Sequence, residues 1–462
     1  MVRLQSLPRG HLREVALKVL LFLAGAALGL LALLPVPWWG WDSDGLVTAL
    51  WTLNGQSYAE VFRTVGTLDA HPPLYYLLYK AWMTAWGFGH LTAGVPEAAV
   101  PLPHLLAVLF FALLSGGLAL AAHDLLGPWG AFAALGLLFL FWDTPWAFAL
   151  RMYPLAAALV TLGAWAYLRG RAFAGSLFGL LALYTHYLSG YALLPFALYR
   201  LFQDWRERSW RALFPFAPYL LYLPWLPWLL KQVREGHSYP ELRPPPEDLF
   251  AYFWQKWPPG VVALFLLLGL VAAWRAPRVR PLLLLALAGP YVWYLTSLFL
   301  NTVLVRYNFI FVGPLVLAGA AALAWAPKPA RWGASLLLLA AGLLWAHLTR
   351  PYWPAWDMVT QARIAERFVA RGVPFVLDRW GGGYAPMLAF VAPGLKDKQE
   401  VLTTGELWRY CGDSRPLLAY RNWFLSPEES LVHQLILCRR GGWREVHGTN
   451  ALTLFLLPPP RR

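Results

Sequence analysis

Acidic side chains gather in a part of the chain that is otherwise poor in charge. Residues 38–86, which begin WWGWDSDGLV and end HPPLYYLLYKAWMTAW, contain Asp42, Asp44 and Asp69 just after an apolar run of membrane length. Because only 13% of the chain is Asp, Glu, Lys or Arg, this grouping indicates a site. An aspartate there could act as a general base that deprotonates a hydroxyl as the hydroxyl attacks. The alternative for Asp42 and Asp44 is helix capping in a solvated loop, and we expect Asp69 to have a structural role in the loop.

Two histidines join these acids as candidates for a binding site. His71 is followed directly by Pro72 and Pro73, and because prolines restrict the backbone around them, the position of His71 should be rigid. The alternative for His71 is a buried structural histidine. His186 stands in the aromatic sequence YTHY near the end of another apolar run, where it forms a further polar group close to the membrane boundary.

Arginine–tyrosine pairs mark two further places where apolar runs begin. Arg151 and Tyr153 precede one run, and Arg306 and Tyr307 precede another. An arginine near the hydrocarbon boundary is costly unless it is paired, so each is a site candidate. The planar guanidinium suits a phosphate group. The alternative is that these arginines extend their charged ends to the lipid headgroups.

Metal ligands are less well defined by the sequence. Asp143 could either pair with Arg151 or ligate a divalent metal together with Asp44. The two cysteines, Cys411 and Cys438, form no metal-binding motif. A disulfide between them would require that their segment lies outside the cytosol, and the sequence leaves both points open.

Composition places the chain in a membrane. Of its 462 residues 59% are hydrophobic, and continuous blocks of Leu, Ala and Phe of membrane length recur, which predicts a polytopic α-helical membrane protein. The formal net charge of +14 comes from arginines in short loops between these blocks. Such arginines determine topology and contact anionic lipids, so we expect no binding of nucleic acid.

Loop charge predicts the topology. Arg3, Arg9, Arg13 and Lys18 place the N-terminus in the cytosol, and residues 36–100 then form a large first outer loop. Within this loop we expect a short helix after Asp44 and an interfacial helix after Pro73. About eleven transmembrane helices follow from the pattern: 15–34, 101–122, 129–141, one ending before Arg169, 172–187, one ending before Arg200, one ending near Leu230, one ending before Arg275, one ending near Asn301, one beginning after Tyr307, and 332–348.

The composition changes at residue 351, where polar and apolar residues become mixed. Residues 355–371 have helical periodicity, and the runs VPFVLD, PLLAY and ALTLFLL are typical of buried strands. We therefore expect a transmembrane domain over 1–350 and a small extracytoplasmic α/β domain over 351–462.

Several of these motifs together resemble a known group of enzymes. The acidic first loop with HPPLYYLLYKAW, then ALRMYPLAAALVTLGAWAYLRG, LALYTHYLSGYALLPFALY and VRYNFIFVGPLVLAGAA, occur in the order found in membrane glycosyltransferases that use polyprenyl-phosphate sugars. This group has the GT-C fold and includes the protein O-mannosyltransferases (glycosyltransferase family 39) and the lipid A aminoarabinose transferases. The resemblance covers about residues 15–350.

The resemblance implies roles for the candidate residues. The catalytic base would be an aspartate of the first loop. The family's adjacent Asp-Glu pair is absent here, so Asp44 and Asp42 are both candidates and Asp44 is preferred. In the family a glutamate precedes the arginine that corresponds to Arg151, whereas here Leu150 stands in its place, and Asp143 is a candidate to compensate. The residues that would bind the donor phosphate and sugar are His71, Arg151, Tyr153, His186, Arg306 and Tyr307.

The expected function is therefore an inverting glycosyltransferase of the cell (inner) membrane. It would move a sugar from a polyprenyl-phosphate donor to a hydroxyl of an acceptor protein or glycolipid at the outer face, surrounded by membrane lipids. The first alternative is a transporter of a lipid-linked sugar or polysaccharide, which should have polar residues through mid-bilayer depth. The second is a non-catalytic scaffold of the envelope, in which the outer charges could be neutralised without consequence.

Overall fold

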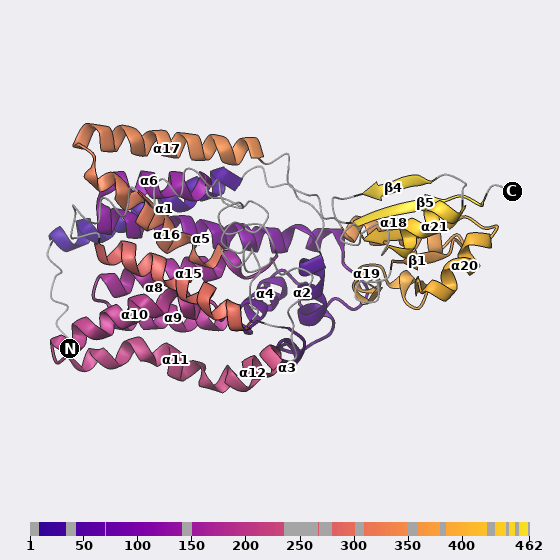
Figure 1. Ribbon diagram of the computed structural model, residues 1–462, viewed down its shortest axis with the longest axis horizontal. Coiled ribbons are helices and arrows are strands. Elements are labelled where there is room, and N and C mark those ends of the chain that lie inside the picture. Colours follow the sequence, from indigo (N-terminus) through magenta and orange to yellow (C-terminus); the bar gives the residue numbers. More distant parts are fainter. Residues whose placement is uncertain are drawn as a thin grey trace. The chain divides into compact units, whose positions relative to one another are not determined.

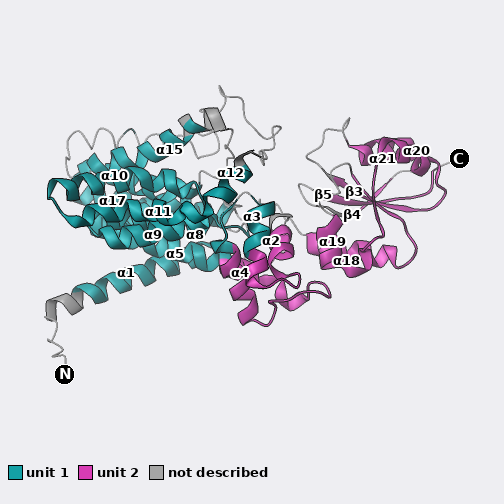
Figure 2. Cartoon of the chain, turned by 90° about the horizontal axis from the view of Figure 1, so that it is seen from below, with its two compact units in different colours: residues 1–36, 62–75, 107–351 teal, residues 37–61, 76–106, 352–462 magenta. Residues whose placement is uncertain are grey.

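The protein is predominantly helical, with a small sheet near its C-terminus (Figure 1). The computed structural model describes residues 9–33, 43–69, 71–140, 150–234, 267, 280–300, 309–349, 358–378, 385–422, 430–439, 443–448 and 452–460. Of the expected span that ends before Arg275, only Leu267 is among these residues. The chain forms two compact units, coloured separately in Figure 2.

The first unit comprises Met1–Val36, Phe62–Tyr75 and Ala107–Pro351. The helices that lie wholly or partly in it follow the expected helical segments, apart from α3, which the sequence did not predict. They are α1 (Arg9–Leu33), α3 (Tyr58–Leu68), α4 (Leu74–Ala85), α5 (Pro101–Leu126), α6 (Pro128–Leu140), α8 (Tyr153–Leu168), α9 (Ala172–Thr185), α10 (Ser189–Arg206), α11 (Ala217–Tyr222), α12 (Leu226–Arg234), α15 (Arg280–Leu300), α16 (Val312–Ala321) and α17 (Lys328–Thr349), with short 3-10 turns η2 (Trp210–Phe216), η3 (Leu223–Trp225) and η6 (Ala322–Trp325).

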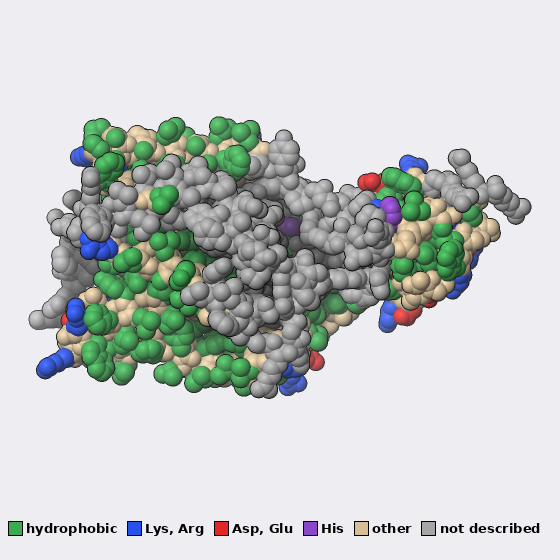
Figure 3. Space-filling view, in the orientation of Figure 1, with side chains coloured by type: hydrophobic (Ala, Val, Ile, Leu, Met, Phe, Trp, Pro, Cys, Tyr) green, Lys and Arg blue, Asp and Glu red, His purple; other side chains and the backbone are tan. Residues whose placement is uncertain are grey.

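Apolar helices dominate this unit. Four described segments are long and apolar enough to cross a membrane: Glu14–Leu33, Glu97–Leu126, Trp210–Gln232 and Lys328–Leu348. Figure 3 shows apolar side chains over much of the face of this part of the molecule. Leucines on separate elements of this unit, such as Leu213, Leu220 and Leu337, are exposed, and an apolar surface of this kind is one that a bilayer covers.

Helix α8 lies in the interior of the unit. Every residue from Tyr153 to Tyr167 is buried, as expected for a helix that is apolar on all sides. Pro154 stands in its first turn, where a missing N–H is tolerated. The chain leaves the helix through Gly170, whose φ of +74° is a conformation that glycine adopts without strain. Local sequence thus determines where α8 begins and ends.

Small residues let α6 and α17 approach closely. A Cβ on Gly136 would lie 2.4 Å from the backbone of Leu338, and one on Gly342 would lie 2.4 Å from the carbonyl oxygen of Gly136. Without a strong hydrophobic driving force between helices in lipid, such close backbone packing stabilises their association. By contrast, four prolines divide the segment Trp210–Gln232 into η2, α11, η3 and α12, because each removes a backbone donor.

The second unit comprises Pro37–Val61, Tyr76–Leu106 and Tyr352–Arg462. Its first two segments contain α2 (Ser43–Leu53), the remaining parts of α3, α4 and α5, and the 3-10 turn η1 (Glu97–Ala99). Lys80 of α4 is buried and donates hydrogen bonds to the carbonyl oxygens of Thr52 and Gly89, both at 3.0 Å. One ammonium group therefore links α4 to α2 and to the segment that follows α4.

The C-terminal part of this unit is an α/β sandwich around a five-stranded sheet. Its strands have the order β2-β1-β3-β5-β4, in which β1 is parallel to β2 and β3, and β5 is antiparallel to β3 and β4. In Figure 2, α18 and α19 lie on one face of the sheet, and α20 and α21 lie on the other. The bounds are β1 (Phe375–Leu377), β2 (Gln399–Val401), β3 (Leu417–Asn422), β4 (Arg444–Gly448), β5 (Leu452–Leu457), α18 (Met358–Val369), α19 (Ala385–Val391), α20 (Thr404–Gly412) and α21 (Leu431–Arg439).

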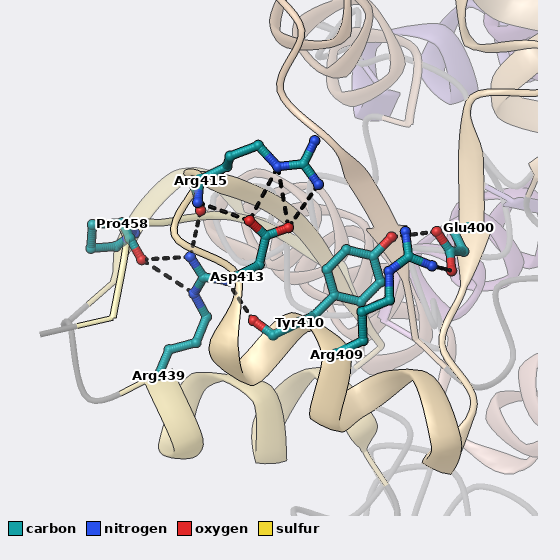
Figure 4. Close-up of polar contacts among 7 residues, drawn as sticks. All are labelled: Glu400, Arg409, Tyr410, Asp413, Arg415, Arg439 and Pro458. Carbon is teal, nitrogen blue, oxygen red and sulfur yellow. Dashed lines mark hydrogen bonds and ion pairs between the residues drawn. The ribbon is translucent and has the colours of Figure 1, made fainter. Parts of the chain in front are cut away.

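A disulfide and a buried arginine hold α20 and α21 together. Cys411 and Cys438 form a disulfide between the two helices, which answers the question that the sequence left open. Next to it, the buried guanidinium of Arg439 donates to the backbone carbonyls of Tyr410, Arg415 and Pro458 (Figure 4). These contacts close one end of the apolar core between the sheet and both helices.

Candidate functional site

Six side chains from three separate segments of the first unit meet in one buried polar cluster. Two come from the short connection between α3 and α4, two from the start of α8, and two from the turn between α9 and α10. We define the buried polar cluster by these residues: Asp69, His71, Arg151, Tyr153, His186 and Tyr187.

The carboxylate of Asp69 contacts both a histidine and an arginine. Its Oδ1 lies 3.0 Å from Nδ1 of His71, and its Oδ2 lies 3.6 Å from Nη1 of Arg151. The three residues are only 6%, 3% and 5% exposed, respectively. Buried charges of this kind are stable only when they are paired, so Asp69 and Arg151 compensate each other's charge.

The aromatic rings hold the second histidine against the first. The ring of His186 lies edge-to-face against His71, with centroids 4.9 Å apart, and it also contacts Tyr187 at 4.9 Å and Tyr153 at 5.9 Å. His186 is fully buried. Its Nδ1 accepts a hydrogen bond from the backbone N–H of Leu188 at 3.2 Å. Because Nδ1 is an acceptor, the hydrogen of this imidazole is on Nε2.

Local backbone structure explains why these side chains are so firmly placed. Pro72 and Pro73 restrict the chain between His71 and the start of α4. Arg151 stands two residues before α8, whose first turn contains Pro154. His186 is the C-cap of α9, with extended dihedrals of φ −156° and ψ 124°, so its side chain leaves the helix at the point where the chain turns into α10.

The structure brings together four of the residues that the sequence singled out as donor-binding. These are His71, Arg151, Tyr153 and His186. The other two, Arg306 and Tyr307, lie outside the described residues, as do Asp42 and Asp143. Asp44 lies in the first turn of α2, where only its backbone is described.

Sequence reasoning missed the part played by Asp69. We expected this residue to shape the loop, whereas its carboxylate joins His71 to Arg151. Its spacing from His71, two residues before a histidine that is held by prolines, is a signal that could have found it. The sequence also suggested Asp143 as a partner for Arg151, and the acidic partner that the structure describes is Asp69.

Metal-ligating side chains do not cluster among the described residues. Among them, no group of three or more His, Cys, Asp and Glu side chains is arranged to hold a metal ion. What the buried polar cluster does offer is hydrogen-bond donors, namely a guanidinium, imidazole N–H groups and tyrosine hydroxyls. Such donors suit an anion with several acceptor oxygens, a phosphate above all.

Comparison with known proteins identifies the fold. No protein-family model matches the sequence, and no curated protein matches it. Two crystal structures of ArnT from Cupriavidus metallidurans match the structure over almost its whole length. The structure bound to undecaprenyl phosphate has 15% sequence identity and a TM-score of 0.50, and the match covers 95% of this chain and 97% of that one. The apo structure has 14% identity and a TM-score of 0.52, with 96% and 98% covered.

The likeness extends over both the helical part and the C-terminal region. ArnT is an aminoarabinose transferase with the GT-C fold, so the family resemblance predicted from the motifs is confirmed at the level of the fold. At this low identity the comparison concerns the fold alone.

Proposed function

We propose that this protein is an inverting glycosyltransferase that moves a sugar from a polyprenyl-phosphate donor to an acceptor hydroxyl at the outer face of the membrane. The observation that carries the proposal is the buried polar cluster, in which Asp69, His71, Arg151 and His186 meet inside an apolar helical unit. An apolar unit is where a lipid-linked phosphate group would be presented. The similar fold of ArnT, whose crystal structure holds undecaprenyl phosphate, also supports a polyprenyl-phosphate carrier.

The proposed reaction is a single displacement at the sugar carbon. As the bond between sugar and phosphate breaks, negative charge develops on the departing phosphate. The guanidinium of Arg151 and the imidazoles of His71 and His186 stabilise this charge, because fixed donors in a site without bulk water cost no reorganisation during the reaction. Asp44 is the proposed base for the acceptor hydroxyl, with Asp42 as the other candidate.

The remaining parts of the proposal concern topology. We propose about eleven transmembrane helices, a cytosolic N-terminus and an extracytoplasmic C-terminal domain in the cell (inner) membrane. The disulfide Cys411–Cys438 supports this orientation, because disulfides persist in oxidising compartments and are rare in the cytosol.

Arg306 and Tyr307 remain proposed donor-binding residues, and a divalent metal at Asp44 and Asp143 remains a proposal that a chelator can test.

The experiment is sugar transfer in vitro with purified protein. A radiolabelled short-chain polyprenyl-phosphate sugar is supplied, and release of free polyprenyl phosphate is measured for wild type, Asp44→Asn, Asp42→Asn and Arg151→Lys, with and without chelator. Loss in Asp44→Asn with retention in Asp42→Asn assigns the base. Removal of a preorganised donor from an oxyanion costs about 10²–10³-fold in rate, which is the loss expected for Arg151→Lys.

Arg331→Lys is the matched control. Arg331 lies in the same unit and donates to the backbone carbonyls of Ala324 and Ala326, with its guanidinium over the ring of Trp129. We expect this variant to transfer sugar at the wild-type rate. If no donor from a broad panel is consumed, and Asp44→Asn and Arg151→Lys bind the lipid as wild type does, the catalytic proposal is wrong. Transport or a scaffold function would then explain the protein better.

A further inference from the structure

The two histidines of the buried polar cluster have different hydrogen-bonding capacities. In His186 the backbone N–H of Leu188 occupies Nδ1, so the neutral ring carries its hydrogen on Nε2 and can donate from there. In His71 the situation is reversed, because Nδ1 faces Oδ1 of Asp69 at 3.0 Å. An ionised carboxylate only accepts hydrogen bonds, so Nδ1 carries the hydrogen, and Nε2 of the neutral ring is an acceptor.

The second oxygen of Asp69 supports the ionised form of the carboxylate. It lies 3.6 Å from the guanidinium of Arg151, and an arginine side chain keeps its positive charge throughout the physiological pH range. A positive neighbour at this distance favours the negative carboxylate. Asp69 therefore acts on His71 as a fixed hydrogen-bond acceptor.

A phosphate diester, in turn, offers only acceptors to the protein. His186 can donate its Nε2–H to a phosphate oxygen while neutral, whereas His71 can donate from Nε2 only after it has taken up a proton. We infer that binding of a phosphate group in the buried polar cluster is coupled to the uptake of one proton by His71, with Asp69 as the positioning residue that holds the imidazolium. This inference rests on the proposed function and specifies the protonation state in which the site binds its donor.

The charges around His71 agree with this coupling. Asp69 faces it from its own segment, and the groups that face the cluster from the other elements are Arg151 and Tyr153 at the start of α8 and His186 and Tyr187 after α9. Asp69 and Arg151 cancel each other's charge. A protonated His71 adds one positive charge to the described cluster, opposite in sign to the charge of a phosphate diester.

The substitution Asp69→Asn distinguishes two roles of Asp69: setting the hydrogen position on His71, or only stabilising the fold. Asparagine has nearly the same shape, but its amide can donate to Nδ1 of His71 and so favours the tautomer with the hydrogen on Nε2. In that tautomer His71 donates to phosphate without taking up a proton. The variant should therefore bind phosphate with little dependence on pH, an outcome that a general loss of structure does not produce.

The test measures the affinity of full-length protein in nanodiscs of neutral lipid for farnesyl methyl phosphate, a diester with one constant charge between pH 5.5 and 8.5. Because the probe does not titrate in this range, any pH dependence comes from the protein. At the upper end of the range, the affinity of wild type should fall about tenfold for each pH unit, as linkage to one proton requires.

Each variant has its own expected result. The pH dependence should disappear in Asp69→Asn and in His71→Gln, whereas His186→Gln should bind more weakly and keep the wild-type slope. Calorimetry in two buffers with different ionisation enthalpies should report uptake of about one proton for wild type near pH 8 and about none for Asp69→Asn. Size-exclusion chromatography checks that each variant is folded, and farnesol serves as the probe without phosphate.

Two outcomes overturn the inference, and they differ from failure of the proposed function. Wild type that binds the diester with the same affinity at every pH overturns it, and so does a wild-type slope that survives in His71→Gln. Both results leave sugar transfer by the same site intact. If wild type does not bind the diester above the level of farnesol at any pH, no phosphate site exists in the cluster, and the proposed function is wrong together with the inference.

Discussion

Replacing Arg439 should loosen the C-terminal sandwich at one defined end. Arg439 is the last residue of α21 and is only 1% exposed. Its Nη1 donates to the carbonyl of Tyr410 at 2.7 Å, its Nη2 donates to Arg415 at 2.6 Å and Pro458 at 3.0 Å, and its Nε donates to Pro458 at 3.2 Å (Figure 4). Burial lowers the pKa of this guanidinium, which is the sign of a charge removed from water. The hydrogen bonds must therefore offset a desolvation penalty.

The magnitude follows from how many of these carbonyls a lysine could still reach. An ammonium group lacks the planar fork of arginine, so we expect Arg439→Lys to keep one carbonyl partner of three. A hydrogen bond to a charged donor contributes about 1.5–3 kcal/mol, and a buried acceptor left without a donor costs a similar amount. Loss of two partners should therefore reduce the local stability by about 3 kcal/mol, on the order of a hundredfold in the local opening equilibrium.

A neighbouring arginine provides the matched control. Arg415 pairs with Asp413 at 2.8 Å, and its side chain is 59% exposed. Its hydrogen bonds hold the pKa of Asp413 down at about 2. Because exposed ion pairs contribute only about 0–1 kcal/mol, Arg415→Lys should change the opening of α21 less than about fivefold.

The assay is hydrogen–deuterium exchange of the full-length protein in detergent, with the disulfide intact. Exchange of a multi-domain protein reports opening of each segment separately, so no single unfolding transition has to be assumed. Amides of α21 and β5 should exchange on the order of a hundredfold faster in Arg439→Lys. The reasoning is refuted if Arg439→Lys and Arg415→Lys change these amides equally, or if α21 keeps its wild-type protection in both.

Two further substitutions test packing in each unit. Lys80→Met keeps the length of the side chain but leaves two buried backbone carbonyls without their donor, so limited proteolysis should cut the first loop at least tenfold faster than in wild type. Gly136→Val places a branched side chain where a Cβ would already be 2.4 Å from the backbone of Leu338, and should lower the melting temperature in detergent by several degrees, through a loss of about 1–3 kcal/mol. Gly333→Ala, where a Cβ meets no atom within 4 Å, should melt as wild type does, and equal effects of the two glycine substitutions would contradict the packing argument.

Much of the fold could be predicted from local patterns. The apolar runs identified most of the described helices of the first unit, though not α3, because a helix that is apolar all round needs no tertiary information to be recognised. Strands β1, β3 and β5 could also be predicted from the sequence, because they are apolar and lie at the centre of the sheet. The two outer strands, β2 and β4, were missed. Their sequences QEV and REVHG are short and not fully buried, so neither hydrophobicity nor alternation marks them.

For the candidate site, the sequence by itself determined which residue types stand at the ends of the apolar runs. It also identified four candidate donor-binding residues, His71, Arg151, Tyr153 and His186. Only the tertiary structure decided that they meet, and that Asp69 joins two of them. The physical reason is that the contact between Asp69 and Arg151 spans more than eighty residues of chain. It exists because the tertiary fold brings the connection between α3 and α4 to the start of α8, so that a carboxylate and a guanidinium meet away from water, where each makes the burial of the other's charge tolerable.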